Sequence, residues 1–206
     1  MDWQAWHRQY DDPESALSRR LEAVQAQIRD ALDRAPAGSV PVIKLCAGEG
    51  RDILGVLEDH PRRADVGARL VELDPVLAAT ARARAPEQVE VITGDASLTD
   101  HYDGMVLAEL VLLCGIFGNI TNQDIERTIA ACPQLCRTGA TVIWTRQRDD
   151  PDLVPTICDW FEQRGFERVW LSAPDAGFGV GAHRFTGAPE PLVTRQSLFS
   201  FVPGGR

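Results

Sequence analysis

The chain has 206 residues, 44% of them hydrophobic, with a formal net charge of −9 and a pI of about 4.9. This length and apolar content fit a single domain with a full core. An acidic surface repels polyphosphate and acidic lipid, so we expect neither nucleic acid nor a membrane as a partner.

Cysteine usage and hydropathy indicate the compartment. The five cysteines form no CxxC pair: Cys46, Cys114, Cys132, Cys136 and Cys158. An odd number of cysteines, with no apolar leader at the start, predicts reduced thiols in a cytoplasmic protein. No apolar run is long enough to span a bilayer. No set of His, Cys and carboxylate residues has metal-ligand spacing, so we expect no metal.

The N-terminal region is predicted to be helical. Helical spacing links four residues near the start: Trp3, Trp6, His7 and Tyr10. Asp12 and Pro13 then predict the start of a second helix, as N-cap and first helical residue. Apolar residues recur every three or four positions over 17–32, which is typical of an amphipathic helix. We expect 1–38 to form a helical extension that can act as a lid, and 39–206 the main domain.

The main domain alternates strands and helices. Strands are predicted at 40–46, 68–74, 89–95, 109–115, 140–146, 167–173 and 197–203, and helices at 51–59, 75–85, 122–137 and 152–164. Strands separated by helices of this length indicate a parallel sheet. The last two strands have no helix between them and are expected to pair antiparallel at the edge. The glycine-rich segment 173–192 between them is predicted to be a mobile loop.

The predicted fold class is therefore α/β: a Rossmann-like, seven-stranded, mostly parallel sheet with an antiparallel C-terminal edge pair, preceded by the N-terminal helical extension. In such a sheet, ligands bind outside the carboxyl ends of the strands. Gly48 and Gly50 follow the first strand, where absent side chains let a ligand approach the backbone. Glu72 ends the second strand, where a carboxylate can accept from ribose hydroxyls, and Asp95 follows the third.

Together, "LCAGEG", "VELDP", "GDA" and the loop after "ELVLLCG" resemble the class I S-adenosylmethionine-dependent methyltransferases over residues 40–206. The resemblance implies that Gly48 and Gly50 lie against S-adenosylmethionine, that Glu72 holds its ribose, and that the other residues border adenine or the methionine arm. The implied cofactor residues are Cys46, Ala47, Gly48, Gly50, Glu72, Leu73, Asp95, Ala96, Cys114 and Gly115.

Two positions depart from the first loop of that family, which usually reads acid-x-Gly-x-Gly-x-Gly. Lys44 stands in the acidic position and removes a carboxylate that commonly helps to hold the ligand's amino group. Cys46 stands for the first glycine and is expected to move the backbone slightly away. Glu49 and Asp52 are candidates for supplying the missing negative charge.

The acceptor is expected to be a small molecule, with secondary metabolism as a candidate setting. The segment "IFGN", which contains Phe117 and Asn119, lies where the family often places substrate-facing groups. It lacks the Asn/Asp-Pro-Pro-aromatic motif of many amide- and base-methylating relatives, which argues against DNA, RNA and protein amides. Trp3 and Trp6 would contact the substrate if the N-terminal helix closes over it.

Methyl transfer needs positioning and exclusion of water more than a strong base, so a dedicated base is not required. If the acceptor must be deprotonated, the candidates by chemistry alone are His7, Tyr10 and His183.

Other interpretations remain open from the sequence. The glycines of the first loop can be only a tight turn, Asp74 a helix N-cap and Asp95 a turn former, and the N-terminal aromatic residues simple packing. The chain can also bind S-adenosylmethionine for other chemistry, such as cyclisation, or bind it without turnover. A nicotinamide dehydrogenase is disfavoured because Ile53 stands where its third glycine belongs. The sequence leaves a monomer or a homodimer open.

Overall fold

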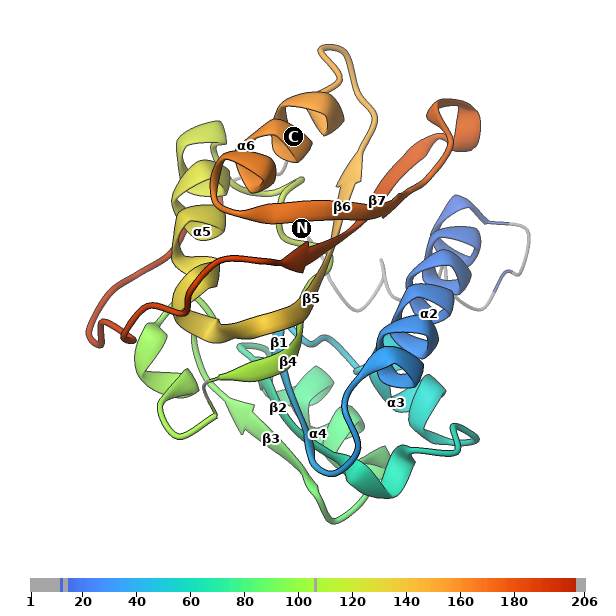
Figure 1. Cartoon of the computed structure of the whole chain (residues 1–206). Coiled ribbons are helices and arrows are strands. Elements are labelled where there is room, and N and C mark those ends of the chain that lie inside the picture. Colours follow the sequence, from blue (N-terminus) through green and yellow to red (C-terminus); the bar gives the residue numbers. More distant parts are fainter. Residues whose placement is uncertain (1–11, 13–14, 106, 203–206) are drawn as a thin grey trace.

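The computed structural model describes residues 12, 15–105 and 107–202 (Figure 1). The strands are β1 (Val40–Leu45), β2 (Val66–Glu72), β3 (Val89–Thr93), β4 (Ala108–Leu113), β5 (Cys136–Gln147), β6 (Phe166–Leu171) and β7 (Phe178–Phe185). The α-helices are α2 (Ala16–Arg34), α3 (Arg51–Leu57), α4 (Pro75–Arg84), α5 (Asn122–Leu135) and α6 (Val154–Gln163). Short 3₁₀ helices are η2 (Arg63–Asp65), η3 (Thr99–Tyr102) and η4 (Pro174–Ala176).

The strands form one seven-stranded sheet in the order β3-β2-β1-β4-β5-β7-β6. The first five strands pair in parallel, whereas β7 runs antiparallel to both β5 and β6. Helices α2, α3 and α4 cover one face, and α5 and α6 cover the other (Figure 1). The predicted α/β class, with its antiparallel C-terminal pair, is confirmed. Each face of the sheet has its own apolar cluster, and the side chains of β4 are buried throughout.

Helix ends follow local capping chemistry. The hydroxyl of Ser15, the N-cap of α2, accepts a hydrogen bond from the Ser18 nitrogen. The predicted start at Asp12 is therefore wrong, because the N-cap is Ser15. The Asp12 carbonyl accepts from the Ser15 nitrogen and the Ser18 hydroxyl. Asp74 caps α4 through the nitrogens of Val76 and Leu77, as the ordinary interpretation of this residue expected.

The seventh strand differs from the sequence prediction. It is formed by residues 178–185, inside the predicted loop, and not by 197–203. Its glycines hide the strand pattern, yet they are needed for packing: a Cβ on Gly181 would lie 2.4 Å from the Trp144 ring, and one on Gly179 would lie 2.4 Å from Val154. Two neighbouring side chains thus fill the space that strand residues normally occupy.

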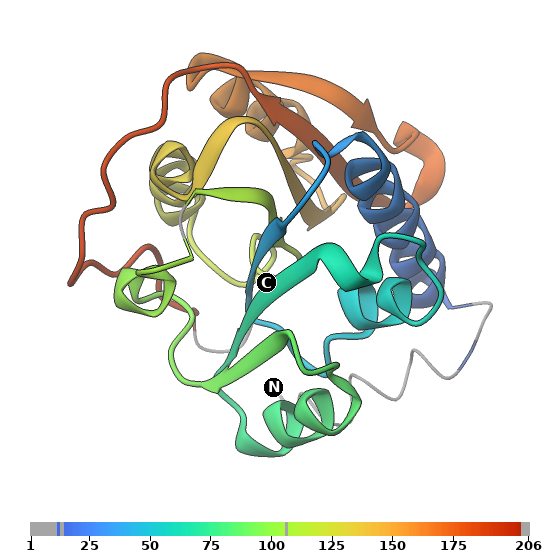
Figure 2. The same cartoon turned by 60° about the horizontal axis from the view of Figure 1, so that its bottom comes forward.

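Residues 195–202 form what we call the C-terminal strap, which Figure 2 shows passing α5 and η3. Three hydrogen bonds join Thr99 and Gln196, and the Leu198 nitrogen donates to the Ser97 carbonyl. Further along, the Val202 nitrogen donates to the Asn119 carbonyl. Leu198 and Phe199 are buried in the cluster beneath α5, while isolated bridges at Ser197 and Phe201 replace a continuous strand. The strap therefore links the segment after β3 to the loop after β4.

Among the helices of the described chain, none combines the length and apolar character needed to cross a membrane.

Candidate functional site

A cavity of about 370 Å³ opens at the carboxyl ends of the central strands. This volume lies in the range of small-molecule sites. The lining residues come from α2, from the ends of β1 to β5, from the first turns of α3 and α4, and from the C-terminal strap: Arg20, Leu21, Val24, Lys44, Cys46, Ala47, Gly48, Glu49, Arg51, Asp52, Glu72, Leu73, Asp74, Leu77, Asp95, Ala96, Cys114, Gly115, Thr145 and Phe201.

Every predicted cofactor residue except Gly50 lines this cavity. Gly50 instead begins α3 with a φ of 69°, and its Cα packs so closely on Leu54 and Leu70 that a Cβ would approach their side chains to 2.8 and 3.2 Å. The left-handed φ of Gly50, together with this close packing, favours glycine at position 50, and the rest of the loop forms the cavity wall.

Cys46 adopts a left-handed conformation with φ of 49°, which non-glycine residues rarely take. Gly48 follows with φ of 56°. The turn is thus kept although its first glycine is absent. Burial raises the pKa of the Cys46 thiol well above its ordinary value, with the Glu72 carboxylate adding to the effect, so the thiol is neutral and is not a nucleophile at neutral pH.

The Glu72 carboxylate joins two loops. Its Oε2 accepts a 2.6 Å hydrogen bond from the Gly48 nitrogen, and its Oε1 accepts a 2.9 Å bond from the Asp74 nitrogen. A carboxylate offers about four lone-pair positions, so these two bonds leave acceptor capacity on both oxygens. Glu72 is therefore fixed at the cavity wall and can still accept hydrogen bonds from a ligand.

Lys44 and Asp52 form a buried ion pair at the end of β1. The Lys44 Nζ lies 2.7 Å from Asp52 Oδ2, and the two side chains are only 3% and 9% exposed. Asp52 Oδ1 accepts from the Ile53 nitrogen, also at 2.7 Å. The other candidate acid, Glu49, pairs with Arg51 at 2.6 Å. Both acids named as substitutes for the motif carboxylate are thus already paired with cations.

The segment after β3 presents Asp95 and Ala96 to the cavity. Asp95 is exposed, and its Oδ1 accepts from the Ser97 nitrogen at 2.9 Å, which is the turn role that the ordinary interpretation expected. The hydroxyl of buried Tyr102 donates to the Ala96 carbonyl. These two hydrogen bonds hold the turn, and both Asp95 and Ala96 line the cavity.

The end of β4 forms the opposite wall. The Gly115 nitrogen donates to the Thr145 hydroxyl at 2.8 Å, and Asn119 Nδ2 donates to the Gly115 carbonyl at 3.0 Å. Asn119 therefore positions this loop without itself lining the cavity. Burial raises the pKa of the Cys114 thiol to about 12, so this thiol too is protonated.

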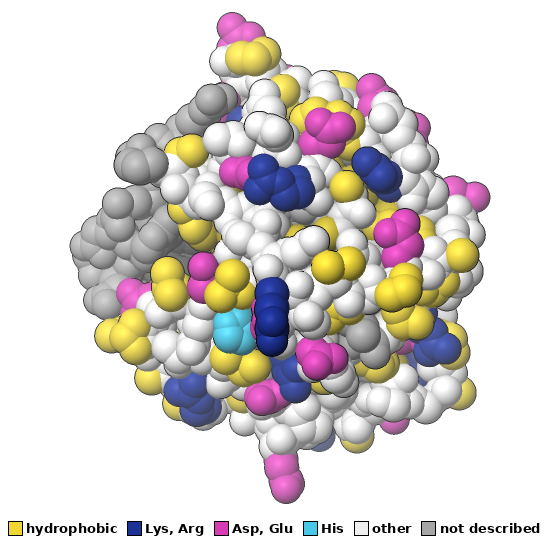
Figure 3. Space-filling view, turned by 90° about the vertical axis from the view of Figure 1, so that its left-hand side faces the viewer, with side chains coloured by type: hydrophobic (Ala, Val, Ile, Leu, Met, Phe, Trp, Pro, Cys, Tyr) yellow, Lys and Arg dark blue, Asp and Glu magenta, His cyan; other side chains and the backbone are white. Residues whose placement is uncertain are grey.

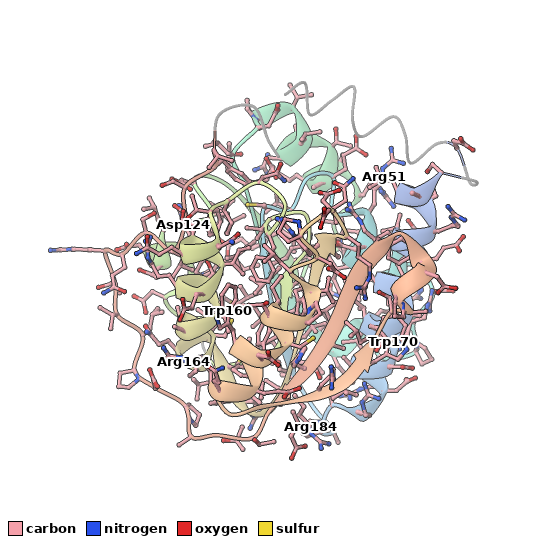
Figure 4. The ribbon with its side chains drawn as sticks, turned by 90° about the horizontal axis from the view of Figure 1, so that it is seen from above. Arg51, Asp124, Trp160, Arg164, Trp170 and Arg184 are labelled. Atoms are coloured by element: carbon pink, nitrogen blue, oxygen red, sulfur yellow. The ribbon has the colours of Figure 1, made fainter. Side chains whose placement is uncertain are left out.

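Two predicted residues lie in the core instead of the site. Phe117 is fully buried, with its ring 6.1 Å from that of Trp144. His183 belongs to β7, and its ring stacks against those of Trp144 and Phe161, which also stack on each other. Its Nδ1 accepts from Trp144 Nε1 at 3.1 Å. Its neighbour Arg184 lies at the opposite end of the molecule from the cavity residue Arg51 (Figure 4). His183 thus does not reach the cavity and is not the base that its loop assignment suggested.

Sequence reasoning missed several lining residues. Leu21 and Val24 belong to the apolar face of the predicted amphipathic helix, and Arg20 lies beside them; no ligand contact was predicted for these three residues. Thr145 lies inside a predicted strand. Phe201 was assigned to an edge strand. The remaining predictions, Trp3, Trp6, His7 and Tyr10, lie outside the described residues.

Two properties of the described residues bear on the use of the site: the charges on one face of the molecule, and the grouping of possible metal ligands. On the face shown in Figure 3, acidic and basic side chains of the described residues are interspersed, and no large basic patch covers it. Within 15–105 and 107–202, no three His, Cys, Asp or Glu residues lie together as a metal site would require.

No protein-family profile matches the chain, and neither does any curated protein. Solved structures match strongly at low identity. A 1,6-didemethyltoxoflavin-N1-methyltransferase of Burkholderia thailandensis, with bound 1,6-didemethyltoxoflavin and S-adenosylhomocysteine, is 18% identical, with a TM-score of 0.64 over 89% of this chain and 86% of that one. The magnesium protoporphyrin IX methyltransferase of Synechocystis PCC 6803, with bound S-adenosylmethionine, is 12% identical, with a TM-score of 0.63 over 89% and 91%.

An O-methyltransferase family protein from Burkholderia thailandensis is 15% identical, with a TM-score of 0.59 over 91% of this chain and 70% of that one. The chain therefore has the Rossmann-like fold of the class I S-adenosylmethionine-dependent methyltransferases. At these identities the likeness establishes the fold, and the activity is argued from the site.

Proposed function

We propose that the protein is an S-adenosylmethionine-dependent methyltransferase that acts on a small-molecule acceptor. One observation carries this proposal: Gly48, Glu72, Asp95 and Gly115, which lie at or just after the ends of four different strands, line a single cavity at the carboxyl edge of the sheet. Ligands of open α/β sheets bind at this edge.

The residues present fit an adenosine-bearing ligand. Glu72 keeps acceptor capacity on both oxygens, as ribose hydroxyls require, and Asp95 offers an exposed carboxylate where an adenine amino group would need one. Leu73, Leu77 and Ala96 supply an apolar wall beside them. The volume of the cavity suits a ligand of this size.

The residues of the chain would bind and orient the reactants. When bound, S-adenosylmethionine supplies an electrophilic methyl group on a sulfonium centre. Glu72 and the first loop hold the adenosine end, and the Gly115–Thr145 hydrogen bond fixes the wall at the end of β4. Leu21 and Val24 of α2 and Phe201 of the C-terminal strap exclude water from the same space. Positioning of this kind supplies rate without a dedicated base.

The acceptor class follows from the charge balance and from the structural neighbours. A net charge of −9 opposes binding of nucleic acid. The toxoflavin and protoporphyrin enzymes are named for small molecules, and they share this fold over most of their length. Small-molecule acceptors, including those of secondary metabolism, are therefore the first class to test.

Calorimetric titration with S-adenosylmethionine and S-adenosylhomocysteine tests the proposal. We expect both to bind at one site per chain with micromolar or tighter affinity. Transfer is then measured with methyl-labelled S-adenosylmethionine and fractions of a small-molecule extract, by release of S-adenosylhomocysteine together with label in a new compound. If neither S-adenosylmethionine nor S-adenosylhomocysteine binds, the proposal is wrong.

Binding of the same ligand without methyl transfer is the second candidate. The specific observation in its favour is the Lys44–Asp52 pair, which replaces the acid of the family's first loop. Binding in the calorimeter together with no label transfer across all fractions would support this candidate over the first.

A further inference from the structure

The C-terminal strap supplies a wall residue of the cavity although it lies outside the sheet. Phe201 lines the cavity together with residues at the ends of β1 to β5. Its side chain is 42% exposed, whereas Leu198 and Phe199 of the same strap are each only 2% exposed. The rings of Phe199 and Phe201 meet edge to face, with their centroids 5.6 Å apart. The strap is therefore anchored in the core by two side chains and presents a third to the cavity.

A backbone hydrogen bond joins the strap to the segment after β3. The Leu198 nitrogen donates to the Ser97 carbonyl at 2.9 Å. The Ser97 nitrogen in turn donates to Oδ1 of Asp95, also at 2.9 Å, and Asp95 lines the cavity. A single residue therefore separates the strap from the carboxylate that we assign to the adenine.

A second backbone hydrogen bond joins the strap to the loop after β4. The Val202 nitrogen donates to the Asn119 carbonyl at 2.9 Å, and Asn119 Nδ2 donates to the carbonyl of the cavity residue Gly115 at 3.0 Å. Phe201 itself forms an isolated bridge with Ile120. Phe201 thus lies between the two connections, and one strap holds both loops and one ring at the cavity.

The exposure of Phe201 gives a ligand something to cover. A ligand in the cavity that packs on this ring removes apolar surface from water, which favours binding. Such a ligand binds more tightly when the strap is docked than when it has opened. Because coupling between two equilibria is reciprocal, the bound ligand then also stabilises the docked strap by the same factor.

We propose that the C-terminal strap is part of the ligand-binding site: Phe201 packs against the bound adenosyl ligand, and docking of the strap and binding of the ligand favour each other. This rests on the proposed function, since it concerns the same cavity and the same ligand. Phe201 is then a binding residue. Leu198 and Val202 position the loops that carry Asp95 and Gly115 through their backbone nitrogens.

Calorimetry with S-adenosylhomocysteine tests the contact. Phe201→Ala should weaken binding roughly fivefold, as expected for losing part of an apolar contact. Phe201→Leu keeps an apolar side chain and should recover part of this loss. The matched control is Leu98→Ala: Leu98 is 38% exposed and bridges Ser197 of the strap, but it does not line the cavity. This control should stay within roughly twofold of wild type.

Hydrogen exchange of single amides, measured by NMR on the wild-type protein, tests the coupling. Saturating S-adenosylhomocysteine should slow exchange of the Leu198 and Val202 amides by at least the factor that Phe201→Ala loses in affinity, because opening of the strap removes Phe201 and both backbone connections. The control is the Glu190 amide, which donates to the Pro133 carbonyl at 3.0 Å in the segment before the strap. Exchange at Glu190 should slow less.

Thermal unfolding verifies that the variants are folded, and if Phe201→Ala is not, hydrogen exchange in the wild-type protein decides alone. Wild-type affinity in folded Phe201→Ala overturns the inference, as does equal slowing at Glu190 and in the strap, which would mean that the ligand stabilises the fold as a whole. Either result leaves the proposed function intact, because S-adenosylhomocysteine still binds. If S-adenosylhomocysteine does not bind the wild-type protein, both the inference and the proposed function are wrong.

Discussion

The Glu72 carboxylate accepts a 2.6 Å hydrogen bond from the Gly48 nitrogen and so ties the end of β2 to the loop after β1. Glu72→Ala should weaken S-adenosylhomocysteine binding by roughly 1–3 kcal/mol, because ribose hydroxyls and two loop nitrogens lose their acceptor. The control is Asp74→Ala, which removes the N-cap of α4 and should cost about 1 kcal/mol of stability with a smaller change in affinity. Calorimetry decides, and an unchanged affinity in Glu72→Ala would refute the ribose assignment.

Cys46 holds a left-handed backbone conformation that a β-branched residue tolerates poorly. Cys46→Val should therefore lower the free energy of unfolding by roughly 1–2 kcal/mol. Cys46→Gly relieves the backbone but loses side-chain packing and gains unfolded-state entropy, so it should stay within about 1 kcal/mol of wild type. Urea unfolding measures both, and equal stability of the two variants would contradict this account of the turn.

His183 should make the fold sensitive to acid. Burial, with a smaller effect from Arg168, lowers its pKa from 6.5 to about 3. The unfolded chain therefore takes up the proton first as the pH falls. The contribution to stability is complete above pH 6.5 and is lost between pH 6.5 and 3, with a slope of at most about 1.4 kcal/mol per pH unit.

His183→Gln keeps an acceptor within reach of Trp144 Nε1 but cannot be protonated in this range. Its unfolding free energy should fall less steeply with acid than that of wild type. Denaturant titrations at several pH values between 4 and 7 (about one unit apart) give the two slopes, and parallel slopes would count against the role of His183.

Gly181 leaves room for the ring of Trp144, since a Cβ there would lie 2.4 Å from two ring carbons. Gly181→Ala should destabilise the protein by roughly 1–3 kcal/mol or more, because the buried ring cannot move aside. Gly67→Ala is the control: it also lies in a strand, but nothing lies within 4 Å of its added Cβ. Thermal unfolding should separate the two variants by several degrees.

The C-terminal strap carries one aromatic residue into the core and one to the cavity. Phe199→Ala should cost roughly 3–5 kcal/mol of stability, because this ring is fully buried. Phe201 is 42% exposed, so Phe201→Ala should cost about 1 kcal/mol or less while it opens the cavity wall. Urea unfolding measures the costs, and a larger loss for Phe201→Ala would show that the strap is anchored elsewhere.

The sequence predicted the strands and helices that follow simple periodicity. β1 to β6 and the four helices between them were placed within a few residues, because apolar runs and glycine turns specify them locally. The same holds for the lining residues at the ends of β1 to β4, whereas Thr145 of β5 was missed. Glu72 was identified by its position after a strand, and the structure confirms that it lies at the cavity wall.

The rest depended on tertiary contacts. β7 was mistaken for a loop because it contains Gly179 and Gly181. These glycines leave room for the side chains of Val154 and Trp144, which are distant in the sequence. The segment "SLFSF" has the apolar pattern of a strand, but it packs as a strap over α5. The ion pair between Lys44 and Asp52 was likewise not predicted, although the sequence analysis named both residues.

The Lys44–Asp52 pair also limits how this loop can evolve. Replacing Lys44 alone with an acid would bury two carboxylates side by side, and neutralising Asp52 alone would leave the Lys44 ammonium without this carboxylate. Each change should lower the free energy of unfolding by roughly 3–5 kcal/mol. Each of these single replacements would therefore remove a large part of the roughly 5–15 kcal/mol by which a typical domain is stable. We therefore expect the residues at positions 44 and 52 to change together, and to covary in an alignment of related sequences.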